Sequence, residues 1–367
     1  MSSYQIANAI KILSIDAVAK ANSGHPGMPL GMADIAAVLW LHFLKFNPKN
    51  PDWCDRDRFI LSNGHGSMLQ YALLHLFGYA VSLEDLKQFR QLHSKTPGHP
   101  ERLHTPGVEV TTGPLSQGLA SAVGMALAEK LLAQQFNQPG CPPLVNHHTY
   151  VFVGDGCLME GLSHESCSFA GEMKLNKLIA FYDCNGITID GPAPKHIKAE
   201  TQARFQAYNW HVLDIDGHDH DAIYQAILTC QQQDRPSLII CNTIIGRGSL
   251  HAGTAKVHGS PLSAEDITQI KKDLQWDSPE FTIPESIYQN IDTQKGIRAE
   301  QDWIAVSLEY FQTAPQVYNE FMRRVNRDLP DNWPQIKQEL LELSLNMKQP
   351  IATRVASQQC LEYLVPQ

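Results

Sequence analysis

YVFVGDG at residues 150–156 and IAFYDCNG at residues 179–186 follow one pattern: an apolar, β-forming run ends on a short tip of acidic, amide and glycine residues. Such runs predict two buried strands. Asp155 and Asn185 are thirty positions apart, which leaves room for a helix and predicts a parallel strand–helix–strand unit. Because parallel strands present their carboxyl ends at one edge of a sheet, we expect Asp155 and Asn185 to lie close together.

Strand and helix patterns alternate on both sides of this unit. Strands are predicted at 59–62, 150–153, 178–182, 212–215 and 238–242, and helices at 161–173, 200–208 and 219–232. A regular alternation of this kind is typical of a sheet whose strands run parallel. We therefore predict an α/β fold, a three-layer sandwich in which a parallel sheet has helices on both faces.

Helices are also predicted at the two ends of the chain. Apolar residues recur at helical spacing in the first segment, at Ile6, Ile10, Leu13 and Ala17. A second helix is predicted from about Met32 to Phe46, and the strand pattern stops at about residue 263. Polar helices are predicted at 300–312 and 315–346. We expect a large domain over residues 1–315 and a helical connector over residues 316–367.

Composition excludes several classes of function. The net charge is −9, from 29 basic and 38 acidic residues, which argues against binding to nucleic acid or to an anionic membrane. No apolar run is long enough to span a bilayer, and the N-terminal segment lacks the features of a signal peptide. The eight cysteines form no CxxC pair, so free thiols in a reducing cytosol are favoured over a disulfide framework or a zinc site. We expect a cytoplasmic protein.

The two strand tips carry ligands suited to a hard cation. The carboxylate of Asp155, the amide oxygen of Asn185 and a backbone carbonyl, with Ile187 as the candidate, are oxygen donors of the kind that Mg²⁺ or Ca²⁺ prefers. A diphosphate would supply further oxygens, and the flanking glycines would let the backbone approach a phosphate closely. GDG or NG alone is most often a tight turn. The two together, each after an apolar strand, are far more specific for a metal–diphosphate site.

Motifs along the whole chain resemble those of the transketolase family. They are SGHPGMPLG (23–31), LSNGHGS (61–67), TTGPLSQG (111–118), VGDGCLMEGLSHE (153–165), IAFYDCNGITIDG (179–191), IIGRGS (244–249) and KVHGSPL (256–262). The resemblance extends from the first helix to the last residue. It implies the thiamine-diphosphate-binding fold, specifically its diphosphate-binding domain. The implied cofactors are thiamine diphosphate and Mg²⁺, or Ca²⁺ or Mn²⁺ in its place.

The resemblance also assigns roles to individual residues. For the metal it implies Asp155, Asn185 and Ile187; for the cofactor it implies His65, Gly113, Pro114, Leu115, Gly156, Asn185 and His258. For substrate and proton transfer it implies His25, His99 and His258, which all lie in Gly- or Pro-rich loops. Imidazole suits such a role because it donates hydrogen bonds and exchanges protons near neutral pH. The other histidines are expected to be structural or exposed.

Three charged residues each allow a functional and a structural interpretation. By resemblance Glu160 and Glu165 would lie at a dimer interface and link two active sites, but both are also acids of the kind that a helix dipole favours in a first turn. Arg354 in IATRVASQ would grip the phosphate of a sugar, since a guanidinium fork matches a phosphate monoester. The alternative for Arg354 is a solvated arginine on a helix.

The implied activity is that of a transketolase of the pentose phosphate pathway. A homodimer would transfer a two-carbon ketol unit from a ketose phosphate such as xylulose 5-phosphate to an aldose phosphate such as ribose 5-phosphate, through a thiamine diphosphate ylid. The family's pyrimidine-binding domain has no counterpart in this chain, which stops at RVASQQCLEYLVPQ. We therefore expect either an excised piece of a longer chain or one subunit of a split enzyme, and no ketol transfer by the chain alone.

Other functions remain open at this point. One alternative is a dihydroxyacetone synthase, which shares the same chemistry. A decarboxylating E1-type component is less favoured, because the substrate histidines match transketolase. A non-catalytic cofactor-binding or assembly subunit is the alternative from another class. Three features depart from the family pattern: Ser116 stands where glycine is usual, Arg247 takes an apolar position, and the segment 192–205 differs.

Overall fold

The computed structural model describes residues 3–194, 197–347 and 349–366. The chain forms two compact units, Met1–Val306 and Ser307–Gln367. The boundary falls within helix α12 (Gln294–Thr313), whose residues therefore belong to both units.

A five-stranded parallel sheet forms the centre of the first unit, with the spatial order β1-β2-β3-β7-β6. Its strands are β1 (Arg58–Leu61), β2 (Thr149–Gly154), β3 (Leu178–Cys184), β6 (His211–Asp216) and β7 (Ser237–Asn242). Every neighbouring pair runs parallel, which confirms the predicted fold class. Gly154 pairs with Asp183 across β2 and β3, so the tips that follow these residues lie at the same edge of the sheet.

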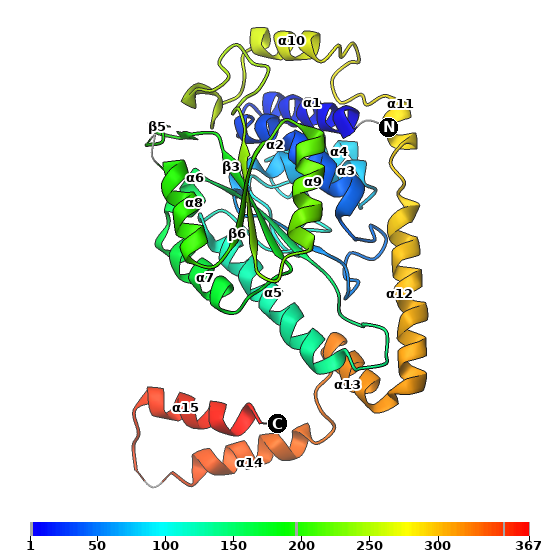
Figure 1. Cartoon of the computed structure of the whole chain (residues 1–367), viewed down its shortest axis with the longest axis vertical. Helices are drawn as coiled ribbons and strands as arrows, with labels where there is room; N and C mark the ends of the chain where they lie inside the picture. The colour runs from blue at the N-terminus through cyan, green and yellow to red at the C-terminus, as the bar shows by residue number, and fades with distance from the viewer. Residues whose placement is uncertain (1–2, 195–196, 348, 367) are drawn as a thin grey trace. The chain divides into compact units, whose positions relative to one another are not determined.

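Helices cover both faces of this sheet, as Figure 1 shows for α9 on one side and for α7 and α8 on the other. One face carries α1 (Ser3–Ala21), α2 (Gly27–Val38), α3 (Ser67–Leu76) and α9 (His220–Gln231), and the other carries α5 (Gln117–Phe136), α7 (Gly161–Glu172) and α8 (Ile197–Ala207). Alternate strand residues face opposite sides: Phe152 packs into the first core, whereas Val151 and Val153 pack into the second. The result is the predicted three-layer sandwich.

Short elements connect these layers. They are the π-helix η1 (Leu39–Phe43), η2 (Gly64–Gly66), α4 (Leu83–Lys87), α6 (Asp155–Met159), the hairpin β4 (Ile187–Thr188) and β5 (Gly191–Pro192), η3 (Ala255–Val257), α10 (Ala264–Asp273) and α11 (Glu285–Gln289). The helix expected from about Met32 begins earlier, at Gly27, and ends in η1. Most of the unusual segment 192–205 folds as the start of α8, while its residues 195 and 196 lie outside the described part of the chain.

The second unit contains the end of α12 and the helices α13 (Pro315–Val325), α14 (Trp333–Leu345) and α15 (Thr353–Leu364). The helical pattern predicted over 315–346 is therefore two helices, because the chain between them holds Pro330, and α14 has a second proline, Pro334, in its first turn. Across residues 3–194, 197–347 and 349–366, none of the helices combines the length and apolar character that crossing a membrane requires.

Candidate cofactor and metal site

Asp155 and Asn185 lie at the carboxyl end of neighbouring strands, as the sequence predicts. Asp155 is the first residue of α6, directly after β2, and Asn185 follows β3. Both side chains line a cavity of about 120 Å³, whose wall also includes Gly154, Gly156 and Ile187. The structure thus brings the three predicted metal ligands to one cavity.

Hydrogen bonds orient the oxygen atoms of these tips. Asn185 Nδ2 donates to Asp183 Oδ2 at 2.9 Å, and Asn185 Oδ1 accepts from the N–H of Ile187 at 2.9 Å. The Tyr182 hydroxyl donates to Asp155 Oδ1. The other carboxylate oxygen, Asp155 Oδ2, is buried and has no hydrogen-bond partner among the described residues. Because a buried polar atom without a partner costs about 1–3 kcal/mol, Oδ2 is the atom that a cation would stabilise.

Asn63 is a further polar residue of this cavity that sequence reasoning missed. Its side chain is 1% exposed, and neither its Oδ1 nor its Nδ2 has a hydrogen-bond partner within the part of the chain that the structure describes. A Cβ added to Gly154 would lie 3.9 Å from Asn63 Nδ2, so the amide lies beside the β2 tip. The signal was present in LSNGHGS, where an NG pair follows a strand just as it does in YDCNG.

The carboxyl groups at these tips are held in a low-dielectric environment. Burial raises the pKa of Asp155, against hydrogen bonds from Tyr182 and the backbone of Gly186. Burial also raises the pKa of Asp183 to about 7; the Thr243 hydroxyl opposes this rise, and the charge of Asp155 adds to it. A divalent cation would favour the ionised form of both groups.

The donor set fits a hard cation that shares its coordination with a phosphate. The described residues contain no group of three or more histidine, cysteine, aspartate or glutamate side chains arranged to hold a metal. A cation at Asp155 would depend on amide and carbonyl oxygens and on oxygens of the ligand. Mg²⁺ is usually bound in this way, through one or two carboxylates together with substrate phosphates.

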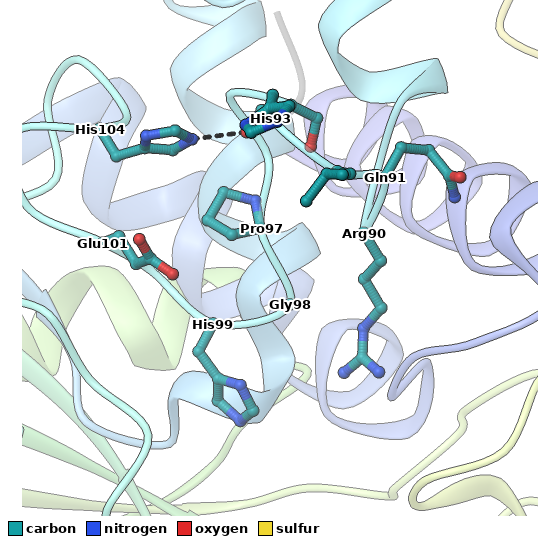
Figure 2. A pocket seen from close by; sticks show the side chains of 10 residues that line it. Arg90, Gln91, His93, Pro97, Gly98, His99, Glu101 and His104 are labelled. Carbon is teal, nitrogen blue, oxygen red and sulfur yellow. Dashed lines mark hydrogen bonds between the residues drawn. The ribbon is translucent and has the colours of Figure 1, made fainter.

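Four loop histidines converge beside the cavity. The ring centroid of His65 lies 5.2 Å from that of His25 and 5.0 Å from that of His258. His99 lies 6.5 Å from His25. His65 and His258 line the same cavity as Asp155 and Asn185, whereas His99 lines a neighbouring open pocket of about 610 Å³. Figure 2 shows the side chains of His99 and Arg90 extending toward the same side of that pocket.

These histidines are uncharged near neutral pH. Burial, together with the positive charge of Arg90, lowers the pKa of His25 to about 4. Burial lowers the pKa of His65 to about 3 and also lowers the pKa values of His99 and His258. The cluster therefore offers neutral donors and acceptors of hydrogen bonds.

Replacing His65 by glutamine is expected to make the chain less sensitive to acid. The folded pKa of His65, about 3, lies below its ordinary value of 6.5, so the unfolded chain binds a proton that the folded chain does not. The contribution of His65 to the free energy of unfolding is fully present above pH 6.5 and is lost progressively as the pH falls from 6.5 toward 3. Between pH 7.5 and 5 the wild type should lose roughly 1–2 kcal/mol more free energy of unfolding than His65→Gln. Urea unfolding at both pH values measures these losses, and a variant with the exposed His93 replaced by glutamine is the control. Equal losses in wild type and His65→Gln would contradict the prediction.

The predicted diphosphate segment Gly113–Pro114–Leu115 approaches the site in part. Leu115 lines the cavity, and a Cβ on Gly113 would lie 3.7 Å from the His99 ring. The next residue, Ser116, is buried with φ at 70°, a left-handed conformation that favours glycine. The usual family glycine is therefore replaced by serine at a position where the backbone itself prefers glycine.

Several residues singled out in the sequence do not line the cavity: His25, His99, Gly113, Pro114, Ser116, Glu160, Arg247 and Arg354. Glu160 is exposed at the start of α7, and Arg354 is exposed on α15 in the second unit. Arg247 turns toward Asp34, whose Oδ2 lies 2.9 Å from Arg247 Nη1. The roles assigned to Glu160 and Arg354 stay predictions.

Comparisons with known proteins point to one family. Residues 2–330 match the family described as transketolase, thiamine diphosphate binding domain. The chain is 56% identical to transketolase 2 of Escherichia coli (strain K12) over 371 residues, which cover 100% of this chain and 55% of that protein. It is 55% identical to a transketolase of Buchnera aphidicola over 365 residues, which cover 98% of this chain and 55% of the relative.

Solved structures give the same picture. Transketolase from Leishmania mexicana superposes with a TM-score of 0.90 at 41% identity, covering 100% of this chain and 54% of that one. A Pichia stipitis transketolase in complex with sedoheptulose 7-phosphate superposes with a TM-score of 0.88 at 43% identity, covering 91% of this chain and 50% of that one. The chain spans about half the length of the curated relatives it matches.

Proposed function

This chain belongs to the transketolase family through its thiamine-diphosphate-binding domain, and we propose that Asp155, Asn185 and the carbonyl of Ile187 hold the divalent cation, Mg²⁺ in the first place, that anchors the diphosphate. The observation that carries this proposal is the buried Oδ2 of Asp155, which has no hydrogen-bond partner among the residues described and lies in the same cavity as the amide of Asn185. Asn185 Oδ1 has a second lone pair beyond the one that accepts from Ile187, so it can also bind a cation.

The surrounding residues have separate tasks in this proposal. Gly156 and the loop that carries Leu115 let the backbone approach the diphosphate. His65 and His258 donate hydrogen bonds from neutral rings toward phosphate or substrate oxygens. Arg90 Nη2 donates to His25 Nδ1 at 3.3 Å, which leaves Nε2 of that ring to carry the proton and donate to a substrate hydroxyl. When bound, thiamine diphosphate supplies an electron sink for breaking a carbon–carbon bond.

The proposed substrates are sugar phosphates. Structures of the Pichia stipitis relative are complexes with sedoheptulose 7-phosphate and with xylulose 5-phosphate. We assign to the whole protein the transfer of a two-carbon ketol unit from a ketose phosphate to an aldose phosphate. In that reaction His25, His99 and His258 contact hydroxyl groups and move protons, and Arg354 binds the phosphate.

A second copy of the protein is the proposed partner at α7. Three large apolar side chains at the end of α6 and on α7 are exposed: Met159, directly before Glu160, by 42%, Leu162 by 38% and Phe169 by 45%. Leu162 and Phe169 are seven residues apart and so lie on the same face of α7. Neighbouring exposed apolar residues of this kind are typical of an interface between subunits. A homodimer that covers them would bury Glu160 at the contact, which matches the role that the family resemblance implies.

Calorimetric titration of the 367-residue chain with thiamine diphosphate tests the proposal. We expect heat of binding with Mg²⁺ present and at least about tenfold weaker binding after removal of the metal with EDTA, because the diphosphate contacts the protein partly through the cation. Ca²⁺ and Mn²⁺ should restore binding. Equal affinity with and without metal, or no binding at millimolar cofactor, would contradict the proposed site.

A further inference from the structure

One face of α2 packs directly against the segment 244–258, which carries Ile245 and His258 into the cofactor cavity. Gly27, Gly31 and Asp34 are spaced by four and three residues and so lie on that face. A Cβ on Gly27 would lie 2.5 Å from the carbonyl oxygen of Val257, and one on Gly31 would lie 3.2 Å from the carbonyl oxygen of Ile244. The segment therefore packs against bare backbone, to which one hydrogen bond joins it, from the N–H of Gly246 to the carbonyl oxygen of Gly27 at 2.9 Å.

Asp34, the third residue of this face, is the centre of a buried charge network. Its carboxylate is 2% exposed. Lys11 Nζ donates to Oδ1 at 2.9 Å, and both His218 Nδ1 at 2.8 Å and Arg247 Nη1 at 2.9 Å contact Oδ2. His220 Nε2 lies 3.4 Å from Oδ1. Burial opposes ionisation of Asp34, but the hydrogen bonds from His218 and His220 and the charge of Lys11 hold its pKa well below the usual range.

His218 links this carboxylate to the segment. The backbone N–H of Ile244 donates to His218 Nε2 at 3.1 Å. A backbone amide can only donate, so Nε2 must be unprotonated. The ring proton is then on Nδ1, where it is donated to the ionised Asp34. His218 is thereby fixed as a neutral bridge, in one tautomer, between α2 and the chain that leaves β7.

We propose that Asp34, His218 and Arg247 form a clamp that positions the segment 244–258 at the cofactor cavity. These are positioning residues, since the described residues that line the cavity include none of the three. Their effect reaches the site through Ile245, one residue after the bridged amide. The bridge itself is independent of the proposed function, whereas its effect on thiamine diphosphate binding rests on it.

The two arms of the clamp differ in strength. The His218 side chain is 9% exposed and the Arg247 side chain is 43% exposed. A half-exposed ion pair contributes little because water screens it, whereas a buried hydrogen bond to a charged group contributes much more. Arg247, noted in the sequence for taking an apolar position, is therefore the weaker, outer arm.

Three variants of the whole chain separate positioning from folding. His218→Leu removes both bonds of the bridge, His218→Gln keeps one donor and one acceptor, and His211→Leu, at the opposite end of β6, is the matched control. Amide hydrogen exchange of residues 243–258 should become about tenfold faster or more in His218→Leu, return to within about threefold of wild type in His218→Gln, and stay unchanged in the control. Affinity for thiamine diphosphate with Mg²⁺ should fall about tenfold in His218→Leu.

The tautomer supplies a direct spectroscopic signature. In ¹⁵N-histidine-labelled wild type, the long-range ¹H–¹⁵N spectrum should show His218 protonated at Nδ1 and not at Nε2, with the signal assigned by its loss in His218→Gln. Protonated Nε2, or unchanged exchange of 243–258 in His218→Leu, would overturn the clamp. If His218→Leu does not fold, hydrogen exchange in His218→Gln and the wild-type spectrum still test the clamp. Failure of the wild type to bind thiamine diphosphate, with the tautomer and exchange results as expected, would contradict the proposed function and support the bridge.

Discussion

Replacing Asp155 by alanine is expected to weaken the binding of thiamine diphosphate in the presence of Mg²⁺ by about 100-fold or more. Asp155 is the one charged group among the three proposed ligands, since the amide of Asn185 and the carbonyl of Ile187 are neutral. Its loss removes the main attraction for a divalent cation, and ligands of this kind dominate metal affinity. Calorimetric titration with cofactor, at fixed Mg²⁺, measures the change.

Asp190 offers a matched control for this experiment. It is an exposed aspartate in the turn between β4 and β5, only a few residues from Asn185. Asp190→Ala removes the same charge from the same region and should leave the affinity within about twofold of wild type, because a surface charge acts only weakly through solvent. An equal loss in Asp190→Ala and Asp155→Ala would show that general charge, and not coordination, governs binding.

Replacing Gly171 by alanine is expected to destabilise the first unit by about 3 kcal/mol or more. Gly171 lies on α7, and an added Cβ would overlap the carbonyl oxygen of Tyr208 and lie 2.8 Å from its carbonyl carbon. Both atoms belong to the backbone, so relief requires α7 and the chain after α8 to move apart. Overpacking of this severity is among the most damaging core substitutions.

Gly124 on α5 is the control for Gly171, because a Cβ there meets no heavy atom within 4 Å. Gly124→Ala should be neutral or stabilise the chain by up to about 1 kcal/mol, since alanine is the better helix former. Guanidinium unfolding followed by far-ultraviolet circular dichroism compares the two variants. Equal midpoints would contradict the close packing between α7 and Tyr208.

The central part of the fold and site follows from local patterns in the sequence. The apolar runs ending at Gly154 and Cys184 form β2 and β3, and the rule for parallel strands places Asp155 beside Asn185. The reasoning succeeds here because strand period, strand length and crossover length all agree. The same agreement predicts helices on both faces of the sheet.

Residues whose role depends on distant partners could not be found in this way. Asn63 becomes part of the cavity only because β1 pairs with β2, a contact across about ninety residues of chain. Asp34 meets His218 across 184 residues, and no motif announces the pair. Serine itself gives no sign of the left-handed backbone at Ser116, a conformation that glycine would suggest; only the glycine usual in the resembling family marks the position.

A crystal structure of this chain with thiamine diphosphate and Mn²⁺, with the metal located by anomalous scattering, tests the central claim most directly. The expected result is one Mn²⁺ bound by Asp155 Oδ2, Asn185 Oδ1 and the carbonyl oxygen of Ile187, with oxygens of the diphosphate completing its coordination. A metal or diphosphate found elsewhere, for example in the pocket beside His93 and His104, or a cofactor bound with Asp155 away from the metal, would contradict it.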